Sequence, residues 1–399
     1  MTPSAARIGD ATSLALAIVV AAPSLYLAML AAIARRVCAP RPARTVRFDV
    51  IVPAHNEEAG IATTIASLLD VDYPRSHFRV IVIADNCTDA TASRAIGAGA
   101  EVIVRHDADH RGKGHALATA FAASARANVA DAVVVVDADT TVSRNLLTAF
   151  AARVVDGTDA MQAEYGVRNP ASSWRTRLTV IAFALFHTTR SLGRERLGLS
   201  CGLRGNGMCF THSLLRRVPH DATSVVEDIE YGIELGLRGV RVAYVGDACV
   251  AGEMPSDGSA ARSQRERWEG GRALLVRRYA LRLLRSALAR RELLTLDLAA
   301  DLIVPPLTFL AIASVSGTLV SVYSARHAGS ALAAAVWTGS TVALLAYVGR
   351  GVQLSRLGLR AIVDLAWAPV YAAWKITLLL RPRRRGVAEW VRTARRGDG

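Results

Sequence analysis

A chain of 399 residues, 52% of them hydrophobic, is long enough for one domain of about 250 residues and a membrane region. Its net charge of +14 does not indicate a nucleic-acid partner, because the arginines lie in bands beside apolar segments, where they suit anionic lipid. The five cysteines form no Cys-x-x-Cys pair, which argues against a zinc site or a disulfide framework and favours a reducing, cytoplasmic catalytic domain.

The first predicted element is a membrane-spanning helix at Thr12–Ala34. Its 23 mostly apolar residues would extend about 34 Å as a helix, which is enough to cross a bilayer. Only Arg7 precedes this segment, whereas five arginines follow it, namely Arg35, Arg36, Arg41, Arg44 and Arg47. The charge bias places the amino terminus outside and the following domain in the cytoplasm. A cleaved signal peptide fits less well, because the apolar run is too long and positive charge follows it.

Strand-like and helix-like segments alternate from Arg47 to about Arg290, which is typical of a mainly parallel sheet covered by helices. The run Ala132–Val136 is continuously apolar, as a strand buried on both faces should be. A coenzyme-binding dehydrogenase is disfavoured, because no Gly-x-Gly-x-x-Gly turn follows the first strand. The expected strands are Phe48–Val52, Arg79–Ile83, Glu101–Val104 and Ala132–Val136, and the expected helices are Glu57–Leu69, Thr88–Ile96 and Gly114–Arg126.

Acidic side chains lie where two of these strands end. Asp85 ends the second, and Asp137 and Asp139 follow the fourth. Ligands of open α/β sheets bind at the carboxyl ends of strands, so these carboxylates should share one crevice. Asp137 and Asp139 would lie on the same side of an extended segment and suit Mg²⁺ or Mn²⁺, which takes its other ligands from water and substrate phosphates. Asp85 is placed to bind a nucleobase or ribose, and the alternative is that these residues only cap turns and helices.

Lys113 lies in Arg111-Gly-Lys113-Gly-His115, at the start of the third expected helix. Small residues around one cation at a helix start can hold phosphate through backbone amides and the lysine charge. A flexible turn is the alternative.

Glu227 and Asp228 begin a further stretch with apolar residues at helical spacing. In the functional interpretation Asp228 is a general base that takes the proton of an acceptor hydroxyl, with Glu227 as a possible substitute. Acidic residues in a first helical turn can also serve only as partners of the helix dipole.

The segment Gln264-x-x-Arg267-Trp268 sets a guanidinium beside a flat apolar ring. Arg267 could bind pyrophosphate oxygens while Trp268 stacks on a sugar. The region that follows, 272–290, alternates leucines with arginines in an amphipathic pattern that suits a helix lying on a membrane surface. Trp268 could therefore also be an interfacial anchor.

Two further membrane spans are expected at Leu302–Tyr323 and Ala331–Val348. A third apolar segment, Ala361–Leu380, contains Asp364 and Lys375 and precedes an arginine cluster. If this segment crossed the bilayer, the cluster would lie outside, against the charge rule, whereas an interfacial or re-entrant helix avoids that conflict. We therefore expect three spans and a carboxyl terminus inside the cell.

Taken together and in this order, these residues resemble the processive, membrane-bound family-two glycosyltransferases, relatives of cellulose, hyaluronan and poly-N-acetylglucosamine synthases. The resemblance runs from about Val50 to Arg272. It implies a GT-A-type fold and an inverting, metal-dependent transfer of a sugar from a nucleotide sugar, usually a UDP-sugar. Two positions depart from the pattern: Ala84 stands where many members have aspartate, and Val226 where the synthases often have threonine.

The resemblance also implies a role for each site residue. Asp85 matches the nucleotide-contacting aspartate, Asp137 and Asp139 the metal and diphosphate pair, and Asp228 the base. The motif beside the acceptor and pyrophosphate is matched by Gln264, Arg267 and Trp268. The segment Gly205-Asn206-Gly207-Met208 falls where the family has its acceptor-side loop.

The sequence thus predicts an α/β, GT-A-type mainly parallel sheet flanked by helices, with transmembrane helices at both ends. The predicted function is sugar transfer from a nucleotide sugar, expected to be a UDP-sugar, onto a polysaccharide or lipid acceptor at the cytoplasmic face of the cell (inner) membrane. The alternatives are single-sugar transfer to a lipid or natural-product acceptor, a membrane-bound nucleotidyltransferase and a catalytically silent scaffold. The expected regions are an anchor at 1–36, a catalytic domain at 46–272, an interfacial helix at 273–299, a membrane region at 300–380 and a basic cytoplasmic tail at 381–399.

Overall fold

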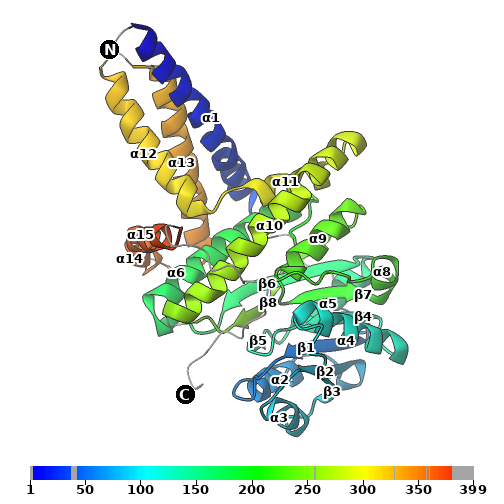
Figure 1. The fold of residues 1–399 in the computed structure, drawn as a ribbon. Coiled ribbons are helices and arrows are strands. Elements are labelled where there is room, and N and C mark those ends of the chain that lie inside the picture. The colour runs from blue at the N-terminus through cyan, green and yellow to red at the C-terminus, as the bar shows by residue number, and fades with distance from the viewer. Residues whose placement is uncertain are drawn as a thin grey trace.

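The computed structural model describes residues 3–36, 43–255, 258–327, 329–355, 357–358 and 360–379. It shows a sheet domain from which a rod of long helices projects (Figure 1). In the described residues the sheet has eight strands, in the order β3-β2-β1-β4-β7-β6-β8-β5. The strands are β1 Phe48–Ala54, β2 Phe78–Asp85, β3 Glu101–Arg105, β4 Ala132–Val135, β5 Thr140–Val142, β6 Ala160–Val167, β7 Met208–Thr211 and β8 Val242–Gly252.

The pairing of the strands is mixed but mainly parallel. β1 pairs in parallel with β2 and β4, and β2 pairs in parallel with β3. β7 runs antiparallel to β4 and β6, β6 is parallel to β8, and β5 is antiparallel to β8. This mainly parallel, helix-flanked sheet confirms the predicted fold class, and the four strands expected from the sequence are present.

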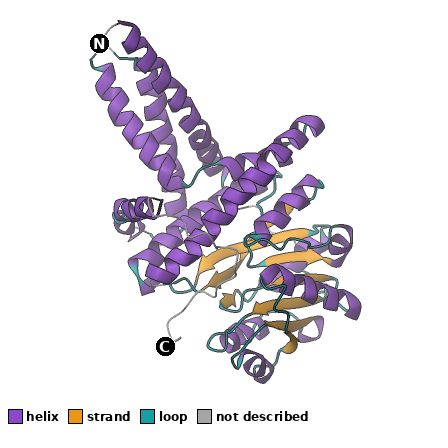
Figure 2. Cartoon of the chain, viewed as in Figure 1, coloured by secondary structure: helices purple, strands orange, loops and turns teal. Residues whose placement is uncertain are grey.

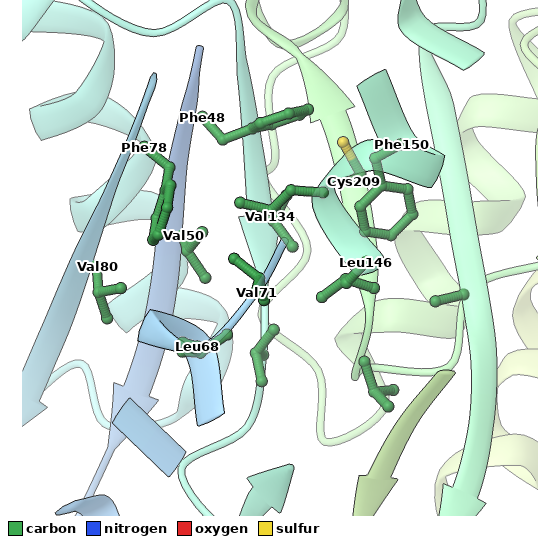
Figure 3. Close-up of a cluster of buried hydrophobic side chains, with 14 of the residues drawn as sticks. Phe48, Val50, Leu68, Val71, Phe78, Val80, Val134, Leu146, Phe150 and Cys209 are labelled. Carbon is green, nitrogen blue, oxygen red and sulfur yellow. The ribbon is translucent and has the colours of Figure 1, made fainter. Parts of the chain in front are cut away.

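Helices cover both faces of the sheet (Figure 2), because side chains along each buried strand alternate between two apolar clusters. Val50 and Val52 of β1 pack on one face with α2 (Ile61–Leu69), α3 (Thr91–Gly97) and α5 (Leu146–Val155). Figure 3 shows Val50 in this cluster, near Leu68. Ile51 points to the other face, which is covered by α4 (Lys113–Ala127), α8 (His212–Arg217) and α9 (Glu227–Leu237).

Three helices of the described chain are long and apolar enough to cross a membrane: α1 Pro3–Ile33, over its part Gly9–Ile33, α12 Leu307–Ala325 and α13 Ala331–Leu354. Their number agrees with the three expected spans. The backbone amide of Ser330 donates to Asp10 Oδ1 at 3.1 Å, and the indole of Trp337 donates to Ser13 Oγ at 3.3 Å. The amino-terminal part of α1 therefore lies beside the connection between α12 and α13, at the far end of the rod from the sheet (Figure 1).

One predicted span begins too early. Leu302 lies in a separate helix, α11 (Leu293–Ile303), and the second span starts only at Leu307. The intervening Pro305-Pro306 explains the break, because proline has no backbone N–H to continue a helix. The segment expected to be interfacial or re-entrant forms α14 (Arg360–Leu365) and α15 (Ala368–Leu379). At 12 residues, α15 is about 18 Å long and too short to span a bilayer.

A single helix, α10 (Gly258–Arg290), runs without interruption across the expected boundary between the catalytic domain and the interfacial helix at 272–273. Its buried residues Leu275, Tyr279 and Leu283 pack on α9 and α11, whereas Leu281 and Leu288 on other faces are exposed. The predicted basic tail at 381–399 lies outside the described residues. The remaining elements are the short helical turns η1 Arg75–His77 and η2 Pro170–Ser172, α6 Trp174–Phe183, the π-helical η3 Ala184–Thr189 and α7 Arg190–Arg196.

A buried ionic network joins the rod to the domain. Arg194 of α7 contacts Asp297 and Asp301 of α11, both at 2.8 Å. Arg190 contacts Asp301 at 3.1 Å and donates to the hydroxyl of Tyr347 in α13 at 3.0 Å. Burial alone would raise the pKa of Asp301, but the surrounding guanidinium groups, Arg194 first, lower it well below its usual range. Because breaking a buried ion pair is costly, this network holds the membrane helices in a defined position over the sheet.

Candidate active site

A cavity of about 1230 Å³ opens at the carboxyl ends of β1, β2 and β4 and extends toward the membrane helices. The end of β1 contributes Pro53 and Ala54 to its wall, and the end of β2 contributes Asp85. Parallel strands end at the same edge of a sheet, so residues far apart in the sequence meet there. All eight predicted site residues line this one cavity: Asp85, Lys113, Asp137, Asp139, Asp228, Gln264, Arg267 and Trp268.

Lys113 lies between the carboxylates of the site. Its ammonium contacts Asp137 Oδ1 at 2.5 Å and donates to the carbonyl oxygen of Gly205 at 2.6 Å. A Cβ added at Gly205 would lie 3.3 Å from Asp228 Oδ2 and 3.5 Å from Lys113 Nζ, so these groups surround one small space. Burial alone would lower the pKa of Lys113, but the neighbouring carboxylates, Asp137 first, raise it. The lysine is therefore a fixed positive charge at the centre of the acidic cluster.

Asp85, the last residue of β2, is buried and already has two polar partners. Arg105 of β3 donates to its Oδ1 at 2.6 Å, and the side-chain amide of Asn86 donates to the same oxygen at 3.1 Å. Arg105 was missed by the sequence reasoning, which had no means of placing β3 next to β2. Arg105 and Asn86 together hold the Asp85 carboxylate at the edge of the cavity.

The Gly205-Asn206-Gly207 loop hydrogen-bonds to the backbone of Asp137 and so helps to position this residue. The side-chain oxygen of Asn206 accepts from the backbone amide of Asp137 at 3.1 Å, and its nitrogen donates to Thr140 Oγ1 at 2.8 Å. Gly205 and Gly207 have φ angles of +77° and +71°, which favour glycine. The loop expected from the resemblance on the acceptor side thus also contacts the backbone of the predicted metal-binding segment.

Glu227 and Asp228 form the first turn of α9, as predicted. Burial raises the pKa of both carboxyls, and Lys113 opposes this shift in each. For Glu227 the proximity of Asp228 raises the pKa further. Two buried carboxyls that share one cation do not both ionise readily, so this pair can hold a proton next to the cavity.

Gln264, Arg267 and Trp268 lie along the first turns of α10 and face the cavity over α9. Burial lowers the pKa of Arg267, and Glu227 opposes this shift, which places the guanidinium within electrostatic reach of the acidic pair. Trp268 is 40% exposed, and the centroid of its ring lies 6.4 Å from that of Phe183. This position at the rim is compatible with both predicted roles of the tryptophan.

The sequence reasoning also missed an aromatic and cationic wall contributed by α6, η3 and the loop before β7. Phe183 and His187 pack with ring centroids 4.4 Å apart, and Arg204 lies 4.4 Å from the centroid of the Phe186 ring. Burial lowers the pKa of His187, and the positive charges of Arg204 and Arg190 lower it further. The imidazole is therefore neutral at pH 7. Nothing in the sequence signals these residues. The π-helical turn that presents them is seen only in the structure, and such turns recur at functional sites.

Asp137 and Asp139 could supply two of the ligands of a divalent cation, but not a complete set. In the described residues no group of three or more histidine, cysteine or acidic side chains is arranged to hold a metal by itself. Asp137 and Asp139 both line the cavity, and Asp137 already holds the ammonium of Lys113, so the position attracts a cation. Two carboxylates suit Mg²⁺ or Mn²⁺, which commonly completes its shell with water and substrate phosphate.

The sequence profile described as "Glycosyltransferase like family 2" matches residues 44–271. Among curated proteins, the chain is 24% identical over 242 residues to "Probable glycosyltransferase YdaM" of Bacillus subtilis, which covers 58% of this chain and 57% of that protein. It is 28% identical over 232 residues to "Beta-monoglucosyldiacylglycerol synthase" of Synechocystis, which covers 56% of this chain and 47% of that protein. The chain therefore spans about half the length of these relatives.

Among solved structures, the fold is similar to that of "Mannosyltransferase PcManGT from Pyrobaculum calidifontis in complex with GDP-Man and Mn2+". The TM-score is 0.53 at 21% sequence identity, and the match covers 91% of this chain and 99% of that one. The match thus covers more of the chain than the sheet domain alone, and it supports the GT-A-type description of the fold.

Proposed function

This chain belongs to glycosyltransferase like family 2, and on that premise we propose that it is an inverting glycosyltransferase that uses a nucleotide sugar, with UDP as the expected carrier. The acceptor is a polysaccharide or a lipid at the cytoplasmic face of the membrane. One observation carries the proposal: the eight residues predicted from the sequence line a single cavity, whose wall also includes residues of two membrane-length helices, α12 and α13. A nucleotidyltransferase would not need Gln264, Arg267 and Trp268 next to a bilayer.

The donor is proposed to lie along the carboxyl ends of β1, β2 and β4. Asp85 would hydrogen-bond the nucleoside, and its pairing with Arg105 fixes the orientation of its carboxylate. Asp137 and Asp139 would hold Mg²⁺ or Mn²⁺, which would neutralise the diphosphate as it leaves. Lys113 and Arg267 approach this region from two other elements and would bind phosphate oxygens directly.

Asp228 is the proposed base. In a direct displacement, the acceptor oxygen forms a bond to the anomeric carbon as the bond from that carbon to the diphosphate breaks. The electron pair of the broken bond leaves with the nucleoside diphosphate, and the hydroxyl proton passes to the Asp228 carboxylate. Burial raises the pKa of this carboxyl, which makes it a better proton acceptor than an exposed aspartate. Neighbouring Glu227 would carry the proton that the pair retains.

Replacing Asp228 by asparagine tests this assignment. The amide keeps the shape but cannot accept the proton, so transfer should fall by roughly 10²- to 10⁴-fold while donor binding is retained. Nucleoside diphosphate release from a panel of nucleotide sugars measures turnover, and calorimetry measures donor binding. Asp156→Asn, at an exposed position after α5, is the matched control. Wild-type turnover of Asp228→Asn would remove this residue from the mechanism.

Single-sugar transfer is favoured over processive synthesis by the size of the membrane region. The described residues contain three candidate spans, a small number from which to build a channel for a polysaccharide. Analysis of the product length distinguishes the two, because a processive enzyme yields long chains even when the acceptor is in excess.

A further inference from the structure

The cavity of the candidate active site does not end at the polar residues. It continues between α12, α13 and α15, where aliphatic side chains form most of its wall and a few hydroxyl groups, such as those of Thr308 and Thr341, form the rest. The aliphatic residues that line this part are Leu307, Ala311 and Val315 of α12 and Leu344, Leu345 and Val348 of α13. We call this part the membrane groove. The beginning of α12 and the end of α13, which contribute these residues, lie at the end of the rod nearest the sheet (Figure 1).

The size of the cavity indicates room for two ligands. Its volume of about 1230 Å³ exceeds the roughly 300–1,000 Å³ of ordinary small-molecule sites. The proposed donor would lie among the acidic residues at the edge of the sheet, which leaves the membrane groove for another molecule. Its lining makes that molecule apolar, because sugar hydroxyls packed against aliphatic walls would lose their hydrogen bonds to water.

Polar side chains of α10 and α15 meet at the wall of the same cavity, at a place that we call the Arg265–Tyr371 junction. The Tyr371 hydroxyl and Arg265 Nε both line the cavity region, are buried and have no hydrogen-bond partner. The guanidinium of Arg265 lies 4.8 Å from the centroid of the Tyr371 ring, and Lys375 pairs with Glu269 at 2.7 Å. Buried polar atoms are rarely left unpaired, so these two atoms indicate a bound polar group at this junction.

We propose that the membrane groove holds the hydrocarbon chain of the acceptor, which is a membrane lipid with a hydroxyl on its headgroup. The headgroup lies at the Arg265–Tyr371 junction, and the hydroxyl reaches Asp228. This assignment rests on the proposed glycosyl transfer and narrows its acceptor from a polysaccharide or lipid to a lipid. The lipid oxygen bonds to the anomeric carbon, the nucleoside diphosphate leaves with the electron pair, and the hydroxyl proton passes to Asp228.

A bulky side chain in the membrane groove tests the proposal. Ala311→Trp should block the groove, whereas Leu319→Trp is the matched control. Leu319 lies one turn beyond Val315 on the same helix, is 68% exposed and does not line the cavity. The full-length protein is reconstituted in vesicles of total lipid from the expression host and supplied with nucleotide sugars that carry a radiolabel in the sugar. Label in the organic extract measures transfer to lipid, and released nucleoside diphosphate measures donor turnover.

Wild-type protein and Leu319→Trp should place label in the organic extract, and Ala311→Trp should reduce it at least tenfold. Because Ala311→Trp should still release nucleoside diphosphate to water, misfolding would be recognised by the loss of that release. A second measurement uses a diacylglycerol with a photoreactive acyl chain, which should crosslink to Leu344 or Val348 in the wild type and not in Ala311→Trp.

Label found only in water-soluble polymer or as free sugar would overturn the lipid assignment, as would crosslinks confined to Leu319 and other outward-facing positions. Both results leave the donor chemistry intact. Failure of the wild type to release nucleoside diphosphate from any nucleotide sugar would instead contradict the proposed function, so the two failures are distinguishable.

Discussion

At the scale of single residues, charge is concentrated around Lys113. Its ammonium contacts Asp137 and the carbonyl of Gly205, and both residues of the Glu227–Asp228 pair raise its pKa. A lysine in this position allows several carboxylates to lie close together without strong mutual repulsion. The proposed donor brings further negative charge into the same space, so the local balance of charge determines whether it can bind.

The proposed cation site leads to a prediction for Asp139. Asp139→Ala removes one of the two carboxylates assigned to Mg²⁺ or Mn²⁺ and should weaken metal-dependent donor binding by at least tenfold. Calorimetric titration with the donor at increasing Mn²⁺ concentrations measures this change. Asp156→Ala, at an exposed position, should bind like the wild type. An unchanged Mn²⁺ dependence in Asp139→Ala would count against the cation site.

A second residue-scale prediction concerns His220, which is buried between the rings of Phe121 and Tyr231. Burial lowers its pKa to about 4, below the value of roughly 6.5 expected in the unfolded chain. Between these values the unfolded state binds the extra proton, so the free energy of unfolding falls as the pH drops from about 6.5 to about 4. The loss amounts to about 3 kcal/mol at most.

His220→Gln should flatten this part of the pH profile, because an amide does not titrate. Thermal unfolding of the detergent-solubilised protein at pH 7 and pH 5 measures the effect. His106→Gln, at an exposed position, is the control and should keep the wild-type profile. An equal loss of stability at pH 5 in wild type and His220→Gln would contradict the prediction.

At the scale of elements, close packing between α1 and α7 positions the first membrane helix against the domain. A Cβ added at Gly193 of α7 would lie 2.6 Å from the backbone oxygen of Leu30 in α1. A backbone atom cannot move aside as a flexible side chain can, so the two helices would have to separate. The same helix carries Arg194, whose ionic contacts with α11 depend on its position.

Gly193→Ala should therefore destabilise the protein by about 1–3 kcal/mol through overpacking. Gly349→Ala in α13 is the matched control, because nothing lies within 4 Å of the added methyl group there. Helix propensity alone favours alanine over glycine by up to about 1 kcal/mol, so the control should be neutral or stabilised. Unfolding temperatures in one detergent measure both, and a stabilised Gly193→Ala would show that the contact does not constrain α1.

At the scale of the whole molecule, the rod fixes which chain segments share a side of the membrane. Contacts of Ser330 with Asp10 and of Trp337 with Ser13 place the α12–α13 connection beside the amino-terminal part of α1. The sheet domain lies at the opposite end of the rod (Figure 1). If the helices span a bilayer, these two ends face opposite compartments, and the charge rule assigns the sheet domain to the cytoplasm.

This topology predicts the labelling of introduced cysteines. In intact cells, a membrane-impermeant maleimide should label His327→Cys, in the α12–α13 connection, above the wild-type background. Ser93→Cys, on the surface of the sheet domain, should react only after permeabilisation. The reverse pattern would place the proposed active site outside the cytoplasm and contradict the use of a cytoplasmic nucleotide sugar.

The sequence alone determined strands β1 to β4 and helices α2 to α4 to within a few residues, because unbroken apolar runs and helical spacing are local signals, whereas β5 and α5 were not predicted. It also identified Asp85, Asp137 and Asp228 as candidates, because isolated acidic residues at strand and helix ends are conspicuous among apolar neighbours. The start of the second span was wrong, at Leu302 instead of Leu307. The sequence did contain the cause, since Pro305-Pro306 interrupts the helix.

Only the tertiary structure decided which residues far apart in the chain became neighbours. Arg105 reaches Asp85 because β3 pairs with β2, and Asn206 supports Asp137 because the loop before β7 lies against the end of β4. The membrane groove depends on how α12, α13 and α15 pack over the sheet edge. Such contacts arise from strand order and helix packing, which are set by the burial of the whole apolar surface and leave no mark at individual positions in the sequence.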